Sequence, residues 1–204
     1  MTISGFTFVR NAVKYYYPVV ESIKSILPIV DEFVVAVGNS DDDTLDLIRS
    51  IGSPKIKIIE TIWDDSLRQG GAVLALETDK AFANISQKAG WAFYLQADEV
   101  VHEKYLATIV KAAEMYNDDM TVEGLLFKYL HFYGSYSWVG NTRKWYRREI
   151  RMVRNMPGIS SYKDAQGFRI DGRKLKVKPI DAHIYHYGWV KSPKHLKDKE
   201  KSFS

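Results

Sequence analysis

Short apolar runs alternate with segments of helical spacing over the first 116 residues of the chain. Residues 33–37 (FVVAV) are consecutive apolar residues, and such a run is typical of a strand buried on both faces of a parallel sheet. The predicted strands span residues 3–9, 33–37, 55–60 and 91–95, and the predicted helices span residues 12–27, 43–51, 72–88 and 102–116. Strands and helices that alternate in this way favour βαβ units around a mostly parallel sheet.

The pattern changes after Asn117. Residues 124–133 form a long β-like run, residues 135–139 a turn and return, and residues 150–153 and 183–187 short β segments. We expect antiparallel strands and loops here that complete the sheet. Residues 192–204 are lysine-rich with a helical pattern, and they end without a stop signal, which favours a chain truncated at its C-terminus.

Charge divides the chain into two halves. Residues 1–120 carry 11 Lys and Arg against 18 Asp and Glu, whereas residues 121–204 carry 18 against 7. A basic half attracts phosphates, anionic lipid surfaces or nucleic acid. No nucleic-acid-binding motif accompanies the charge, so we predict no nucleic-acid partner.

The composition excludes several kinds of chemistry. The chain has no cysteine, which rules out a thiolate nucleophile, an iron–sulfur cluster and a cysteine-based zinc site. It has neither a Gly-x-Ser-x-Gly nucleophile motif nor a Gly-x-x-x-x-Gly-Lys-Ser/Thr phosphate loop. Its apolar runs are much shorter than the ~20 residues of a membrane-spanning helix, and its N-terminus shows no signal-peptide pattern. We therefore expect a cytoplasmic protein.

Polar residues follow three of the predicted strands. Arg10 and Asn11 follow the first strand, residues 38–43 (GNSDDD) the second, and residues 96–99 (QADE) the fourth. Ligands of open α/β sheets bind beyond the carboxyl ends of the strands. The coincidence of three such clusters therefore predicts a binding site at that edge of the sheet.

In this order the three clusters resemble motifs of the family 2 glycosyltransferases of the GT-A fold. Residues 9–12 (VRNA) are similar to the family's Arg-Asn-Glu-like segment, residues 38–43 to its Gly/Ser/Asp-rich turn, and residues 95–99 (LQADE) to its Leu-Asp-Ala-Asp-Glu metal motif. Residues 186–189 (HYGW) look like the His-Tyr segment that ends some of these domains. The resemblance implies an α/β, Rossmann-like three-layer sandwich with a mixed, mostly parallel sheet, in a single domain over residues 1–204.

The resemblance also implies an activity, the transfer of a sugar from a nucleotide-diphosphate donor to a saccharide or lipid-linked acceptor of a bacterial cell-surface glycan. Residues 1–120 would form the nucleotide-sugar-binding half. Residues 121–204 would form a basic acceptor-side half, which also suits peripheral contact with the inner face of a membrane. The departing diphosphate needs charge neutralisation, which a divalent metal ion, Mn²⁺ or Mg²⁺, supplies.

Each functional group of such a site has candidates in the sequence. Asp98, at the second Asp of the metal motif, and His186 are the metal ligands that the resemblance implies. Asp164 is the leading candidate for the general base and Asp181 the second. The nucleotide-binding candidates are Arg10, Asn11, Asn39, Ser40, Asp41, Arg68 and Gln96, and the acceptor-side candidates are Glu99, Trp138 and Trp145.

The sequence departs from the family pattern at two positions. Gln96 replaces the first Asp of the metal motif, and Ala36 or Val37 stands where many relatives have an Asp before the turn. A neutral amide is a weaker ligand for a hard cation than a carboxylate, and the activity itself is in question for that reason. Two alternatives therefore stay open. One is a non-catalytic saccharide- or nucleotide-binding protein, and the other is a nucleotidyltransferase, whose related sheet also places carboxylates and a metal at strand ends.

Overall fold

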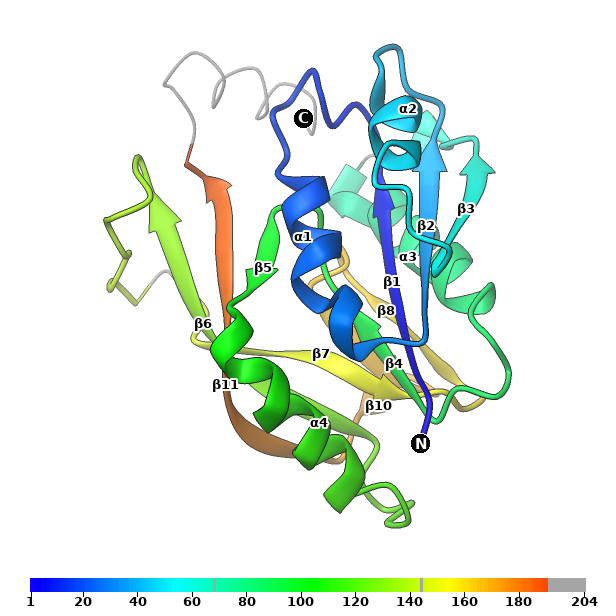
Figure 1. Ribbon diagram of the computed structural model, residues 1–204, viewed down its shortest axis with the longest axis vertical. Coiled ribbons are helices and arrows are strands. Elements are labelled where there is room, and N and C mark those ends of the chain that lie inside the picture. The colour runs from blue at the N-terminus through cyan, green and yellow to red at the C-terminus, as the bar shows by residue number, and fades with distance from the viewer. Residues whose placement is uncertain (68, 144, 191–204) are drawn as a thin grey trace.

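A mixed eight-stranded sheet forms the centre of the protein (Figure 1). The computed structural model describes residues 1–67, 69–143 and 145–190. The strands of this sheet follow the order β3-β2-β1-β4-β7-β6-β11-β5. Their bounds are β1 Ile3–Val9, β2 Glu32–Gly38, β3 Ile56–Thr61, β4 Trp91–Tyr94, β5 Glu99–Val101, β6 Gly124–Tyr133, β7 Arg148–Arg154 and β11 Val177–Trp189.

The direction of the strands brings most of their carboxyl ends to one edge. Strands β1 to β4 are parallel to one another, and β6 is parallel to β11. Strand β7 runs antiparallel to both β4 and β6, so β6 and β11 point the same way as β1 to β4. Strands β5 and β7 run the other way and therefore bring their amino ends to the same edge.

Two further layers cover the faces of the sheet, which confirms the predicted three-layer α/β architecture. Helices α1 Val19–Ile26, α2 Thr44–Arg49 and α4 Leu106–Met115 share one core, and helix α3 Ala72–Ala83 shares the other with a small sheet of strands β8 Ile159–Tyr162, β9 Gly167–Ile170 and β10 Arg173–Lys174. Strand β2 is buried on both faces, as its apolar run predicts. Phe33 and Val35 face the first core, and Val34 and Ala36 face the second. Short 3₁₀ helices span Leu27–Ile29, Asp65–Leu67, Gln69–Gly71 and Glu103–Tyr105.

The predicted helix over residues 12–27 is too long. Helix α1 begins at Val19, directly after Pro18. Asn11 and Tyr16 adopt left-handed backbone conformations, with φ of 55° and 54°, and such residues interrupt a right-handed helix. The helix predicted over residues 72–88 likewise ends earlier, at Ala83.

We predicted antiparallel strands for the second half of the chain, but the structure also contains a parallel pair there. Strands β6 and β11 form a parallel pair, in which His186 lies opposite His131. Strand β11 is also much longer than the predicted segment 183–187. In its first part exposed polar residues such as Lys178 and Asp181 interrupt the apolar residues, so no apolar run marked this part as a strand. No helix in the described part of the chain is long and apolar enough to cross a membrane. The helix predicted over residues 192–204 lies outside the described residues.

Candidate functional site

The segments after β1, β2 and β4 leave the sheet at the same edge. Val9 of β1 lies opposite Val37 of β2, and Phe6 of β1 lies opposite Tyr94 of β4. Burial and then the charge of Asp98 raise the pKa of Tyr17 in the segment after β1. Helix α1, which follows this segment, is bonded to the residues after β4, because Ser22 Oγ donates to the Gln96 carbonyl oxygen (2.9 Å). The three polar clusters therefore lie around one edge.

Hydrogen bonds join the residues after β1 to those after β2. The Asn11 backbone N–H donates to Ser40 Oγ (3.0 Å), and the Asp41 backbone N–H donates to Asn11 Oδ1 (2.9 Å). Arg10 Nε donates to the Asn39 carbonyl oxygen (3.1 Å). The structure thus brings together five of the residues predicted to bind a nucleotide, while their role in binding stays a prediction.

The segment after β3 adds two residues that the sequence reasoning missed, Trp63 and Asp65. The guanidinium carbon of Arg10 lies 5.4 Å from the centroid of the Trp63 ring, and Arg10 forms an ion pair with Asp65 at 2.8 Å. The Trp63 backbone N–H donates to Asn39 Oδ1 (3.1 Å). The rule that ligands bind beyond parallel strand ends also covers this segment, so applying the rule to the third predicted strand would have found both residues.

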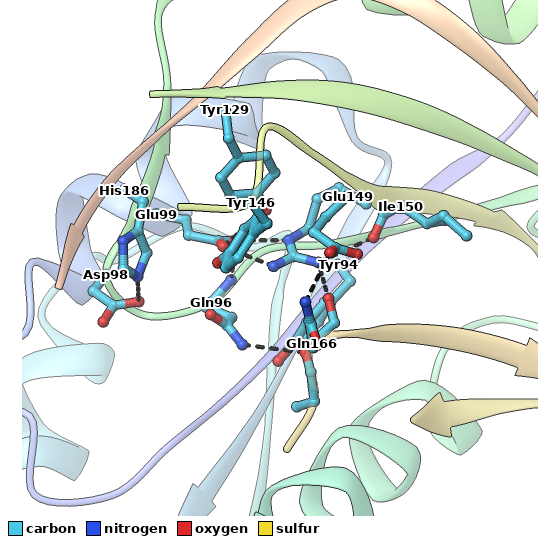
Figure 2. A network of polar contacts seen from close by, with 12 residues as sticks. Tyr94, Gln96, Asp98, Glu99, Tyr129, Tyr146, Glu149, Ile150, Gln166 and His186 are labelled. Atoms are coloured by element: carbon cyan, nitrogen blue, oxygen red, sulfur yellow. Dashed lines mark hydrogen bonds and ion pairs between the residues drawn. The ribbon is translucent and has the colours of Figure 1, made fainter. Parts of the chain in front are cut away.

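Asp98 and His186 lie side by side, one after β4 and the other near the end of β11 (Figure 2). His186 Nε2 is 3.7 Å from Asp98 Oδ1, and each side chain is only 10% exposed. Gly188 packs against both. A Cβ there would lie 2.5 Å from Asp98 Oδ2 and 2.9 Å from His186 Nε2. Any larger residue at position 188 would therefore displace the pair.

Hydrogen bonds fix the tautomers of two neighbouring histidines. His131 Nε2 lies 2.8 Å from the Tyr146 carbonyl oxygen and must donate to it, because a carbonyl only accepts. Burial and then the proximity of His186 lower the pKa of His131, which favours a neutral ring. The His131 Nδ1 atom therefore accepts from His186 Nδ1, 3.2 Å away. In the neutral form of His186 the lone pair then lies on Nε2, facing Asp98.

This donor set fits a divalent metal ion. A lone pair and a carboxylate that face each other favour a cation between them, and metal-binding histidines usually donate their other N–H to a partner, as His186 does. In the described ranges no three His, Cys, Asp or Glu side chains form a group that could hold a metal ion. Asp98 and His186 supply two ligands, so the others would come from water or from a bound molecule.

Glu99, the next residue, belongs to a buried charge network (Figure 2). Its two carboxylate oxygens each accept a hydrogen bond of 2.8 Å from the Arg151 guanidinium, and both side chains are fully buried. The Tyr129 hydroxyl (2.8 Å) and the Gln96 backbone N–H (3.1 Å) donate to the same carboxylate. The predicted acceptor-side role of Glu99 is therefore wrong, because its oxygens are satisfied inside the protein and shielded from any ligand.

A loop of the second half that contains Asp164 reaches Gln96 at the same edge. Gln96 Nε2 donates to the Ala165 carbonyl oxygen (3.2 Å), a bond that an ionised Asp at this position could not make. The adjacent Asp164 is exposed and packs against Gly71, where φ is 74° and a Cβ would lie 2.5 Å from the Asp164 Cβ. The Gln96 side chain thus joins the segment after β4 to this loop.

Glu149, at the start of β7, is a further carboxylate near this edge that the sequence reasoning missed. It accepts a hydrogen bond from Gln166 Nε2 (2.9 Å), and burial raises its pKa. The sequence predicts an antiparallel strand at residues 150–153, and the structure extends this strand (β7) back to Arg148, which brings Glu149 to the edge.

The remaining predicted residues differ in where the structure places them. Asp181 is not brought to this edge. It is 82% exposed and paired with Lys128 at 2.7 Å, further back along β11. Trp145 stacks on His131, with ring centroids 5.0 Å apart, and lines a hollow of about 350 Å³. Trp138 is 75% exposed in the loop after β6. Arg68 lies outside the described residues.

The protein has a GT-A, Rossmann-like α/β fold. No protein-family model matches the chain, and no curated protein matches it in sequence. Among solved structures, S. aureus TarS superposes with a TM-score of 0.53 at 13% identity, over 100% of this chain and 39% of that chain. TarS 1–349 in complex with UDP superposes with a TM-score of 0.50 at 17% identity, over 70% of this chain and 38% of that chain.

A second solved structure shares the fold over almost its whole length. The 4-diphosphocytidyl-2C-methyl-D-erythritol synthase from Anaerococcus prevotii superposes with a TM-score of 0.50 at 12% identity, over 98% of this chain and 97% of that chain. This chain spans about two fifths of the TarS chain but almost all of the synthase. At these identities the similarities show the fold.

Proposed function

We propose that this protein is a glycosyltransferase that moves a sugar from a nucleotide-diphosphate donor to a saccharide or lipid-linked acceptor. The observation that supports the proposal is that the polar cluster around Ser40 and the Asp98–His186 pair lie at ends of strands that share one edge of the sheet. We expect the diphosphate of the donor to lie between them. The fold adds support, since TarS structures with this architecture were solved in complex with UDP and with UDP-GlcNAc.

In this proposal Asp98 and His186 hold a divalent ion, Mn²⁺ or Mg²⁺, together with the diphosphate of the donor. A metal ion bound there neutralises the charge of the departing diphosphate. His131 orients His186, because its Nδ1 atom accepts the Nδ1 hydrogen of that ring. Arg10 and the residues after β2 bind the base and ribose at the neighbouring strand ends.

The acceptor would approach from the side of the second half. Asp164 stays our candidate for the base that deprotonates the acceptor hydroxyl, since it is exposed and lies next to the Ala165 carbonyl that Gln96 holds. Trp138 and Trp145 are candidates for stacking on sugar rings, whose C–H faces are apolar. A cell-surface glycan or its lipid-linked precursor is the acceptor class that we propose.

A nucleotidyltransferase is the second candidate, because the diphosphocytidyl-methylerythritol synthase matches this chain over nearly its full length. A thermal-shift experiment separates the two activities. We expect UDP with Mn²⁺ to raise Tm by about 5–10 °C at a hundred times Kd, and to raise it more than either compound alone. A larger shift with CTP and metal would favour the second candidate instead. If oligosaccharides stabilise the protein but nucleotides do not, the protein is a saccharide-binding protein without this activity.

The Asp98→Asn variant tests the role of the metal in the same assay. We expect it to lose the Mn²⁺-dependent part of the shift, because the amide is a poor ligand for a hard cation, while its Tm without ligands changes little. Asp118→Asn, at an exposed position outside the edge, is the matched control and should keep the full response. An unchanged response in Asp98→Asn would remove Asp98 from the site.

A further inference from the structure

Three aromatic side chains in the loop that joins β6 to β7 are exposed to solvent. We call residues 133–148 the aromatic–basic loop. Tyr133, Tyr136 and Trp138 are 53%, 70% and 75% exposed. The tip is ordered by the Tyr133 backbone N–H, which donates to the Trp138 carbonyl (3.0 Å), and by a β-bridge between Phe132 and Val139. In Figure 1 this segment lies at the outer margin of the molecule, beyond the end of β6.

The charge of the aromatic–basic loop has one sign. Its sequence contains four basic residues and no acidic one, and Arg143, Arg147 and Arg148 are exposed. The end of β11 adjoins the loop, because the Trp189 carbonyl accepts from the Gly134 backbone N–H (3.0 Å). From this end the sequence continues into residues 191–204, which contain five lysines.

We propose that the aromatic–basic loop docks the protein on an anionic lipid surface. Trp and Tyr rings favour the headgroup level of a bilayer, and exposed Lys and Arg side chains are attracted to anionic lipids. The exposed rings stand at the loop tip and the arginines follow behind it in the chain, which suits a tip that enters the headgroup layer first. Single-stranded nucleic acid also binds aromatic and basic groups, but it needs a groove that tracks a backbone rather than a projecting tip.

Docking goes beyond the proposed transfer reaction and does not depend on it. The hollow lined by His131 and Trp145 lies beside the aromatic–basic loop, so a docked protein would hold this hollow at the membrane surface. An acceptor carried by a lipid would reach it there. The vesicle experiment below uses no nucleotide, so its failure would leave the thermal-shift result unaffected.

Co-sedimentation of the full chain with vesicles tests the proposal. We expect at least about tenfold stronger binding to vesicles of phosphatidylcholine with 30% phosphatidylglycerol than to pure phosphatidylcholine, and a several-fold loss in 0.5 M NaCl. Tyr136→Ser/Trp138→Ser should weaken binding about fivefold or more, and Arg143→Glu/Arg147→Glu should abolish the preference for anionic vesicles. Met115→Ser and Lys111→Glu, at exposed positions of α4, are the matched controls and should bind within twofold of the wild type.

Three results would overturn the proposal. The first is equal or absent sedimentation of the wild type with both kinds of vesicle. The second is binding of the loop variants at the level of the controls. The third is loop-dependent binding to a single-stranded oligonucleotide that displaces the protein from anionic vesicles. Circular dichroism checks the fold of every variant, and Trp138→Ser alone replaces the double variant if that one does not fold.

Discussion

Asp98 and Glu99 are neighbours in the chain, yet they belong to two regions of different design. Glu99 lies in a buried network, where Arg151, Tyr129 and a backbone N–H satisfy its oxygens. Asp98 lies at the sheet edge, where its Oδ1 atom is 3.7 Å from Nε2 of His186 and the side chain is 10% exposed. Removing one partner of a buried ion pair leaves the other charge uncompensated and destabilises the fold, whereas in our proposal Asp98 at the sheet edge serves to bind a cation. Variants on the two sides should therefore affect different properties.

The largest effect is expected in the buried network. In Arg151→Met the Glu99 carboxylate stays buried without its cation, so the free energy of unfolding should fall by about 3–5 kcal/mol. Urea denaturation at pH 7 measures the loss. Asp98→Asn, at the sheet edge, should by comparison lose little stability and mainly change ligand binding.

The double variant Glu99→Gln/Arg151→Met sharpens this result. It removes both charges while it keeps a side chain of similar size at each position, so most of the lost stability should return. A single Arg151→Met variant within about 1 kcal/mol of the wild type would contradict the view that the network supports the fold.

The sequence could predict the edge of the sheet because the signal there is local. The run of residues 33–37 and the polar residues that follow it mark one strand and its end, and parallel pairing then brings the ends of β1, β2 and β4 together. The helical spacing of apolar residues could not predict the start of α1, because this spacing continues through Tyr16, where the backbone is left-handed.

The sequence could not separate Asp98 from Glu99, because two adjacent carboxylates look alike without their partners. The partner of Glu99 is Arg151, 52 residues further along the chain. The partner of His186 is His131, which lies opposite it only because β6 and β11 are parallel and in this register. Both distinctions depend on contacts between distant strands, and these contacts decide which carboxylate is structural.

At the sheet edge, an intermediate effect is expected from His131, on metal affinity more than on stability. His131→Phe removes the acceptor that orients His186, so Mn²⁺ affinity in the presence of UDP should weaken about tenfold, as is typical when a ligand's hydrogen-bond partner is lost. His131→Gln should restore most of the affinity, because its amide can accept from His186 and donate to the Tyr146 carbonyl. Calorimetric titration measures both. Equal affinities in the two variants would show that His131 only fills space.

The smallest effect on stability is expected at the half-exposed ion pair of Glu123 and Arg173, which serves as a reference for the buried pair of Glu99 and Arg151. Glu123 accepts hydrogen bonds from Arg173 (2.6 and 2.8 Å) and from the Lys176 backbone N–H (2.7 Å), and the Arg173 side chain is 51% exposed. The Arg173 hydrogen bonds lower the pKa of Glu123 from 4.5 to about 2. Because the folded-state pKa is lowered, the stabilisation is complete above pH 4.5 and is lost as the pH falls toward 2.

Glu123→Gln should therefore reduce the free energy of unfolding by about 1 kcal/mol at pH 7, and the difference from the wild type should shrink through that acid range. A constant difference from pH 7 to pH 2, measured by urea denaturation, would assign the effect to packing rather than to charge.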